Sequence, residues 1–302
     1  MKMISKKNQR IYINIFGIKI CFSTFSTFKE RKKSYNYYQS FKTAQEIPAA
    51  TGYLRLRQLA LVKLLSAFDM VCQKENLEYW IDFGTLLGAV RHKGFILWDD
   101  DIDISMMRSD YDKLLSLKEH ISIQYPDIII LDACNNQNKC FLRVYHKNLT
   151  SLFIDIFPYD FYHSGLTKEE RDLLSKKLSC CKRPKVLFVK KSAEQIREYF
   201  RKKTVAVLNG KSVNFADKPA IFMGLDFPHG WKNKVYSWDT IYPLKKIKFE
   251  EFWFNSPNLP EKVCESIYGR YMEIPKDTYQ RHSGFEIADS LVKKLEDYIN
   301  MK

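Results

Sequence analysis

The spacing of hydrophobic and polar positions changes along the chain, and it predicts which segments form helices and which form strands. Over residues 53–76, apolar residues recur at helical spacing with basic residues between them, which is typical of a helix with one buried face. Asp101–Met106 alternates charged with apolar residues, as a half-buried strand does, and Leu77–Asp82 is also interpreted as a strand. Between them, Gly84–Gly88 predicts a turn into a short helix, which Gly94 ends.

The segments that follow complete a small mixed sheet flanked by helices, over about residues 77–160. Further strands are predicted at residues 127–133, 140–146 and 151–157, and Pro158 is expected to end the last of them. Further helices are predicted at residues 110–119, where Ser109 can cap the first turn, and at residues 167–182, 193–209, 261–268 and 285–298.

The N-terminal segment is predicted to contain a pair of strands. Apolar residues alternate in twos on both sides of Gly17, and Lys19 interrupts the apolar stretch, so neither a signal peptide nor a spanning helix is expected. Residues 1–33 hold nine Lys and Arg against one acid, Glu30. This charge is compatible with a solvated basic tail or with contact to an anionic membrane, where each Lys or Arg contributes roughly 1 kcal/mol.

Composition limits the broad class of the protein. A chain of 302 residues with 45% hydrophobic residues can bury a sizeable core. We divide it into a basic segment with a linker (1–50), a catalytic core (51–165) and a helical, aromatic-rich part (166–302).

The net charge of +14 indicates anionic partners such as nucleotide phosphates. Seven cysteines without a C-x-x-C pair indicate reduced thiols in a cytosolic setting.

The densest chemical signal is the run of acids from Asp99 to Asp103. Strand alternation places Asp101 and Asp103 on one face, where two carboxylates can share a divalent ion, and oxygen ligands favour Mg²⁺ or Mn²⁺ over zinc. Asp99 and Asp100 are interpreted as loop acids, and Asp82 as the end of a strand. The alternative is a solvated acidic turn, which explains poorly why isoleucines alternate with the acids.

Two further features join this run. Asp155 lies between apolar residues on a later strand, where it is a candidate third metal ligand or an ordinary paired aspartate. Gly84 and Thr85 open a helix, and a helix N-terminus offers N–H groups to phosphate. A glycine-led turn, a strand with two acids and a later strand with one acid are together the layout of nucleotidyltransferase-like enzymes.

These residues resemble a known family. The run GTLLGAVRHKGFILWDDDIDISMMRSDYD at residues 84–112, with FIDIFPY at 153–159, closely resembles the signature of the LicD family of phosphocholine transferases, fukutin and fukutin-related protein. A looser match comprises residues 268–271, Pro275 and 281–282, so the resemblance covers about residues 53–283. The sequence departs from the pattern at Leu97, where a proline is expected, and at Arg270, where an acid is common.

The resemblance implies an α+β, nucleotidyltransferase-like fold and transfer of a phospho-substituent from a CDP-activated donor to a sugar hydroxyl. The leading cargo is phosphocholine, and the acceptor is a cell-surface glycan of the lipopolysaccharide, capsule or teichoic acid type. Carried over to this chain, Asp101, Asp103 and Asp155 would bind metal, and Gly84 and Thr85 would face phosphate.

Other roles come from the chemistry of the side chains. Asp155 is the candidate to orient or deprotonate the acceptor hydroxyl. The candidates for contact with the donor are basic residues, which can also be solvated surface charges: Arg91, His92, Lys93, Arg143, Arg281 and His282.

Two other functions remain open at this point. One is a nucleotidyltransferase that uses CTP to activate a phosphorylated small molecule. The other is a basic nucleic-acid-binding module, although no nucleic-acid-binding motif is found, so we expect no such partner. We expect the protein on the cytoplasmic side, in peripheral contact with the inner face of the membrane through residues 1–33.

Overall fold

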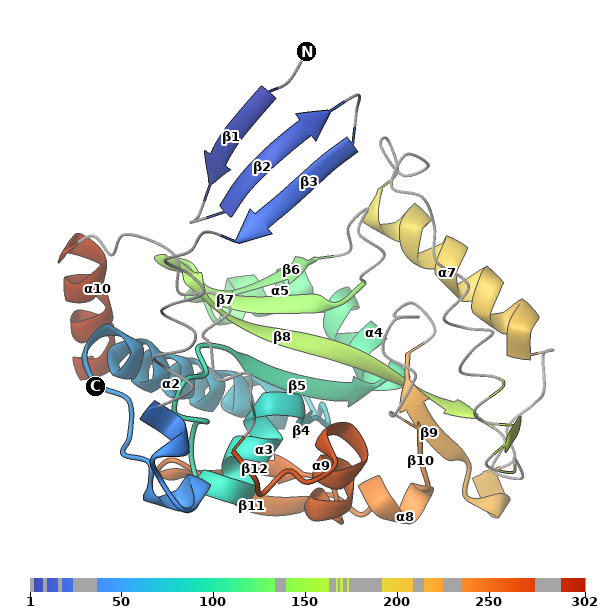
Figure 1. Ribbon diagram of the computed structural model, residues 1–302. Coiled ribbons are helices and arrows are strands. Elements are labelled where there is room, and N and C mark those ends of the chain that lie inside the picture. The colour runs from blue at the N-terminus through green and yellow to red at the C-terminus, as the bar shows by residue number, and fades with distance from the viewer. Residues whose placement is uncertain are drawn as a thin grey trace.

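The computed structural model describes residues 3–7, 10–15, 18–23, 37–133, 140–162, 167, 169–170, 173, 192–208, 215–224, 235–274 and 289–301. Its centre is a mixed sheet of seven strands around the long strand β8 (Leu149–Tyr162) (Figure 1). On one side of β8 lie β5 (Ile102–Met107), which is parallel to it, and then β4 (Trp80–Ile81). On the other side, the sheet contains β7 (Leu142–His146) with β6 (Ile128–Asp132), and β9 (Ala220–Met223) with β10 (Val235–Tyr236).

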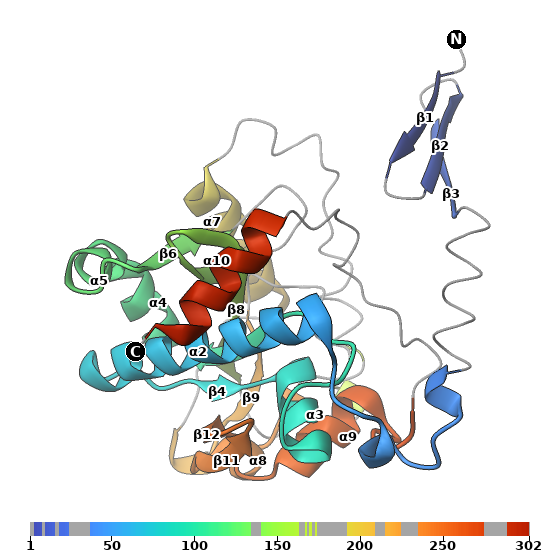
Figure 2. The same ribbon diagram turned by 90° about the vertical axis from the view of Figure 1, so that its left-hand side faces the viewer.

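Helices flank this sheet, which confirms the expected α+β class. They are α2 (Gly52–Lys74), α3 (Phe83–His92), α4 (Arg108–Ser116), α5 (Lys118–Gln124), α7 (Ala193–Leu208), α8 (Trp238–Ile241), α9 (Pro260–Tyr268) and α10 (Asp289–Asn300). Short 3₁₀ turns lie at Ala44–Glu46 and Phe215–Asp217, and β11 (Lys245–Phe249) forms a hairpin with β12 (Phe252–Ser256). Helix α2 packs against β8, α10 lies along α2, and α3 packs between β5 and α9 (Figures 1 and 2).

The register of the two central strands separates the core from the site. Ile102 and Ile104 of β5 lie beside Ile154 and Ile156 of β8, and all four are completely buried. Burying such a side chain contributes about 1.5–3 kcal/mol, so the isoleucines fix this register strongly. Because side chains alternate along a strand, the residues between the isoleucines lie on the opposite face.

Several local expectations are wrong. Pro158 does not end the third predicted strand: β8 continues to Tyr162, with Pro158 in register with Met106 and its carbonyl accepting from the Gly224 N–H at 2.6 Å. Ser109 lies inside α4 and caps nothing, since α4 begins at Arg108. The strands β9 to β12 in the aromatic-rich part were not predicted, and most of the helix expected at 167–182 lies outside the described residues.

The helix expected at 110–119 is divided between α4 and α5, which meet at Leu117. The other predicted helices form close to their expected ends. The helix predicted at 53–76 is α2, the turn at Gly84 opens α3, and the predictions at 193–209, 261–268 and 285–298 correspond to α7, α9 and α10. Strands β9 and β10 belong to the C-terminal part of our division, yet they extend the same sheet as β8.

The N-terminal segment forms a separate antiparallel sheet of three strands. The predicted pair is confirmed as β2 (Arg10–Ile15) and β3 (Ile18–Ser23), and β1 (Met3–Lys7) adds a third strand beside β2. Figure 2 shows this sheet standing away from the body of the protein. Among the described residues, no helix is long and apolar enough to cross a membrane.

The cysteines do not all have the expected state. Cys72 and Cys264 are free and buried, as predicted. Cys140, however, is disulfide-bonded, so the expectation that every cysteine is a reduced thiol is wrong at this position.

The sharp turn between α3 and the following loop depends on Gly88. A Cβ at this position would lie 2.4 Å from the Gly94 carbonyl oxygen and 3.1 Å from the Ile96 nitrogen, both of them backbone atoms. Gly to Ala inside a helix normally stabilises by about 0.8–1 kcal/mol. Here we predict the opposite sign: Gly88→Ala should lower the free energy of unfolding by roughly 1–3 kcal/mol, measured by urea denaturation. A variant as stable as the parent would contradict this close approach.

Candidate active site

A row of charged residues crosses three neighbouring strands on the face opposite the isoleucines. Asp103 of β5 is in register with Asp155 of β8, and Asp155 is in register with Arg143 of β7. Residues directly opposite each other on paired strands share a face of the sheet. Arg143 binds Asp155 through two hydrogen bonds of 2.7 and 3.0 Å, and its guanidinium lies 3.7 Å from the centre of the Phe153 ring. Asp155 is therefore held in one orientation beside Asp103.

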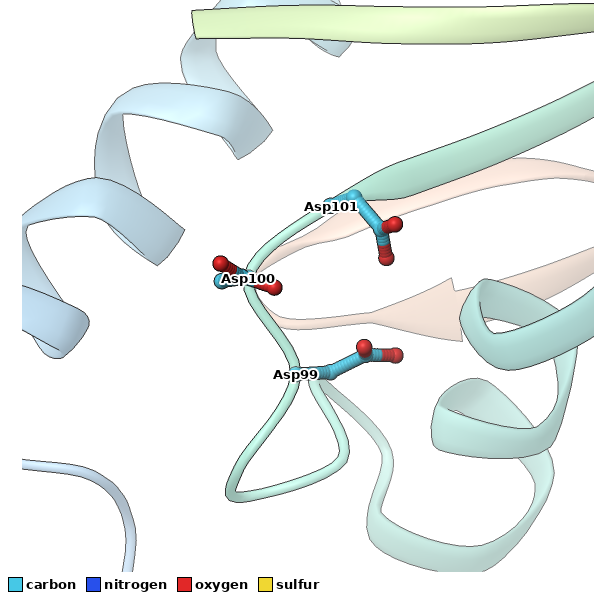
Figure 3. A group of neighbouring side chains, drawn as sticks. All are labelled: Asp99, Asp100 and Asp101. Carbon is cyan, nitrogen blue, oxygen red and sulfur yellow. The ribbon is translucent and has the colours of Figure 1, made fainter. Parts of the chain in front are cut away.

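The loop before β5 brings three more carboxylates together. One carboxylate oxygen of each of Asp99, Asp100 and Asp101 lies within 4.8 Å of the others, close enough for one metal ion to be shared. Figure 3 shows Asp99 and Asp101 pointing to the same side of the loop. We interpreted Asp99 and Asp100 as loop acids. The structure places them in this group, while Asp103 and Asp155 lie in the adjoining strand row.

Burial and neighbouring carboxylates both raise the pKa values of two of these acids. The pKa of Asp103 is raised well above its usual value, first by burial and then by Asp101 and Asp155. The pKa of Asp99 is raised in the same way, by burial first and then by Asp101. Carboxylates gathered against their mutual repulsion are a donor set suited to a hard divalent cation. The residues present therefore fit Mg²⁺ or Mn²⁺.

Side chains of helix α2 bind the main chain of the loop at residues 99–101, which we call the acid loop. Arg57 donates from Nε to the Asp100 carbonyl at 2.6 Å and from Nη1 to the Ser151 carbonyl, at the start of β8, at 2.8 Å. Gln58 donates to the Asp99 carbonyl at 2.9 Å. Because these donors bind carbonyl groups, they fix the main chain of the loop.

The turn between β11 and β12 also holds this part of the chain, through hydrogen bonds of Glu250 that we call the Glu250 clamp. Glu250 accepts two hydrogen bonds from Arg55 at 2.9 and 2.7 Å and one from the Phe95 N–H at 3.1 Å. Burial alone would raise the pKa of Glu250, but the bonds from Arg55 and Phe95 outweigh burial and lower it, so the carboxylate stays ionised. The Glu250 N–H also donates to the Lys93 carbonyl at 2.8 Å. The loop that leads to the acids is thus tied to α2 and to the C-terminal hairpin.

The start of α3 is organised by Asp82, which we had interpreted only as the end of a strand. Its carboxylate accepts from the Phe83 N–H at 2.8 Å, from the Ser105 hydroxyl at 2.7 Å and from the Tyr159 hydroxyl at 3.0 Å. Asp82 is only 1% exposed. It therefore connects α3, β5 and β8 as a buried acceptor, a role that the sequence did not reveal.

The two residues expected to face phosphate lie at this helix start. A Cβ on Gly84 would lie 2.6 Å from a carboxylate oxygen of Asp99, so glycine lets the helix approach the acid loop. Thr85 is buried, and its hydroxyl accepts from the Asp103 N–H at 2.9 Å. Thr85 thus fixes the position of Asp103, and its contact with phosphate stays a prediction.

The basic candidates at the end of α3 differ in their surroundings. Arg91 is buried and donates from Nη1 to the Tyr271 carbonyl at 2.6 Å and from Nε to His92 Nε2 at 2.9 Å. Its Nη2 has no hydrogen-bond partner in the described part of the chain. Burial, and then the charge of Arg91, lower the pKa of His92 to about 4, so this imidazole is neutral and its Nε2 lone pair is in use. Lys93 is exposed at the helix end.

Tyr268 of α9 begins the motif at residues 268–271, and we did not single it out by itself. Its pKa is raised well above the usual value, by burial first and then by the charges of Asp103 and Asp82. The residue as a whole is 41% exposed. The candidates Arg281 and His282 lie outside the described residues.

Comparison with known proteins identifies the domain. Residues 76–190 match the family described as LicD/FKTN/FKRP, nucleotidyltransferase domain. This range contains α3, the acid loop, and the strands that carry Asp103, Arg143 and Asp155.

Individual relatives extend this match. Lipopolysaccharide cholinephosphotransferase LicD of Haemophilus influenzae is 28% identical over 250 residues, covering 76% of this chain and 94% of that protein. An uncharacterized protein of Rickettsia typhi, RT0683, is 32% identical over 116 residues, covering 36% of this chain and 37% of that protein. Human ribitol 5-phosphate transferase FKRP is 27% identical over 101 residues, covering 33% of this chain and 20% of that protein.

The Glu250 clamp generates a prediction for stability and for the acid loop. Glu250→Ala removes three hydrogen bonds and leaves Arg55 without its carboxylate, so the free energy of unfolding should fall by roughly 2–4 kcal/mol in urea titrations. The affinity for Mn²⁺, measured by calorimetry, should fall with it. Glu273→Ala breaks an exposed pair with Arg270 and serves as the control, with an expected change within about 1 kcal/mol. Equal losses in both variants would contradict the clamp.

The raised pKa of Asp103 predicts a conflict between stability and function. A carboxyl whose pKa is higher in the folded state costs stability at pH values above that pKa, because the folded protein must then hold the charge. At pH 8 without divalent ions, Asp103→Asn should therefore raise the melting temperature by about 2–5 °C. The same variant should lose most of the stabilisation that Mg²⁺ gives the parent. A lower melting temperature would show that charge repulsion is not the dominant effect there.

Proposed function

We propose that this chain, whose residues 76–190 match the LicD/FKTN/FKRP nucleotidyltransferase domain, is a LicD-type transferase that moves a phosphate-linked substituent from a CDP-activated donor to a sugar hydroxyl of a cell-surface glycan. The observation that carries the proposal is the in-register pair Asp103 and Asp155 beside the Asp99–Asp101 group. The similarity to the cholinephosphotransferase along 94% of that protein favours phosphocholine as the cargo and lipopolysaccharide or a related glycan as the acceptor.

We propose that Asp101, Asp103 and Asp155, with Asp99 alongside, hold Mg²⁺ or Mn²⁺. Such an ion neutralises phosphate charge and orients the donor when bound. The carboxylates would supply the oxygen ligands. Thr85 binds the N–H of Asp103, and Asp82 binds hydroxyls of β5 and β8, so both residues help to fix the strands that carry Asp103 and Asp155.

The transfer needs a group that receives a proton. The ion pair with Arg143 fixes the position of Asp155, and we propose that its carboxylate orients the sugar hydroxyl and takes its proton. The hydroxyl oxygen then forms a bond to the phosphorus that carries the substituent. The bond from that phosphorus to the bridging oxygen breaks, and CMP leaves with the electron pair.

The donor phosphates need cationic and N–H partners. Arg91 is the best placed of the basic candidates, because its Nη2 is buried and lacks a hydrogen-bond partner among the described residues. Gly84 lies in the first turn of the same helix, Lys93 follows its last residue, and Tyr268 is the last residue of α9, which packs against this helix. We propose that these groups line the donor side, with catalysis on the cytoplasmic side of the membrane.

A donor panel tests this function and identifies the cargo. The purified full-length protein with Mg²⁺ is incubated with CDP-choline, CDP-ethanolamine, CDP-glycerol or CDP-ribitol and a glycan acceptor, and CMP release is measured. We expect one donor to be preferred and EDTA to stop the reaction. Asp101→Asn should lower turnover at least about a hundredfold, whereas the exposed Asp112→Asn should not.

Two outcomes would reject the proposal. Pyrophosphate release from CTP, without CMP release from any CDP-linked donor, would indicate a nucleotidyltransferase instead. Normal turnover by Asp101→Asn would show that the acid group is not the active site.

A further inference from the structure

The register of the N-terminal sheet sorts its residues into two unlike faces. Residues that pair across antiparallel strands share a face, and the next residue along each strand lies on the other. The pairs Ile4–Ile13 and Ile13–Ile20 place three isoleucines in one row. The complete face, read from the register, comprises Ile4, Lys6, Ile11, Ile13, Ile15, Ile18, Ile20 and Phe22. The opposite face comprises Met3, Ser5, Lys7, Arg10, Tyr12, Asn14, Lys19, Cys21 and Ser23.

This apolar face requires a covering surface. The three strands form a sheet of their own, separate from the seven-stranded sheet that holds the site, and they stand away from it in Figure 2. A contiguous apolar patch of this kind marks an interaction site.

We propose that the three-stranded sheet is a docking surface for an anionic lipid bilayer, with its isoleucine face lying in the membrane interface. The positive charge of the N-terminal segment favours an anionic lipid surface over a protein partner. Residues 1–33 hold nine Lys and Arg against Glu30 alone. Protein interfaces are depleted in lysine, whereas basic residues around an apolar face are what anionic head groups attract.

The position of the charges fits this arrangement. Among residues 3–23, Lys6 is the only charged residue that the register places on the isoleucine face, and it lies on the edge strand β1. Lys7 and Arg10 pair at one end of the sheet, and Lys19 lies on the polar face.

The sheet lies on the membrane and does not cross it. Its strands have five to six residues, whereas a spanning strand needs about 9–11. An open sheet also has edges with unpaired N–H and C=O groups, which the hydrated interface tolerates and the hydrocarbon core does not. This inference is independent of the transfer reaction, because vesicle binding is measured without donor or acceptor.

Two double variants of the full-length protein distinguish the contributions of the two faces to vesicle binding. Ile13→Thr with Ile20→Thr changes one cross-strand pair of the apolar face, and Tyr12→Thr with Cys21→Thr changes the neighbouring pair of the polar face. Threonine favours strands, and neither variant alters charge. In co-sedimentation with vesicles of phosphatidylglycerol and phosphatidylcholine, the isoleucine variant should bind at least about tenfold more weakly. The tyrosine and cysteine variant should bind within about twofold of the parent.

Charge is tested on the same vesicles. Replacing Lys7, Arg10 and Lys19 by Gln should reduce binding to anionic vesicles at least about tenfold and leave weak binding to pure phosphatidylcholine unchanged. Equal binding by both double variants, or equal loss in both, overturns the proposal. It is also overturned if the isoleucine variant still binds vesicles but changes from dimer to monomer in light scattering, since a second copy of the chain would then cover the face.

Discussion

The mutual repulsion of carboxylates is the constraint on which this structure depends. Asp99, Asp100 and Asp101 are gathered within one loop, and Asp103 and Asp155 lie side by side on adjacent strands. The pKa values of Asp99 and Asp103 are raised, by burial first and then by the neighbouring carboxylates. Such an arrangement lowers stability when the acids are ionised, so the surrounding structure must hold it in place, and the cation that we propose there would offset this cost.

The rest of the fold supplies that restraint. The isoleucines beneath the acids fix the register of β5 and β8, while Arg57 and Gln58 of α2 bind the carbonyl groups of the acid loop. Glu250 reaches the same loop from the distant β11–β12 turn and joins it to Arg55. These donors and acceptors act mainly on the backbone of the loop. The main chain is therefore held by hydrogen bonds at the position where we propose that the carboxylates bind a cation.

The C-terminal third completes the site. The carbonyl of Tyr271 accepts from Arg91, and α9 packs against α3, so the C-terminal part covers the helix that begins at the acids. The N-terminal sheet is separate from this assembly, with the isoleucines and Lys6 on one face and Lys7, Arg10 and Lys19 on the other. In our proposals, this sheet binds the lipid surface and the acid-bearing domain catalyses the transfer.

The sequence alone determined the elements whose pattern is local. Alternation in twos predicted β5 with Asp101 and Asp103 near its start, helical spacing predicted α2, and the acid run marked the chemistry. Tertiary structure decided which distant groups meet. Whether Asp155 pairs with Asp103 depends on strand order, and the partners of Glu250 and Asp82 come from other elements. No periodicity encodes those contacts, because they arise from packing between segments up to 195 residues apart.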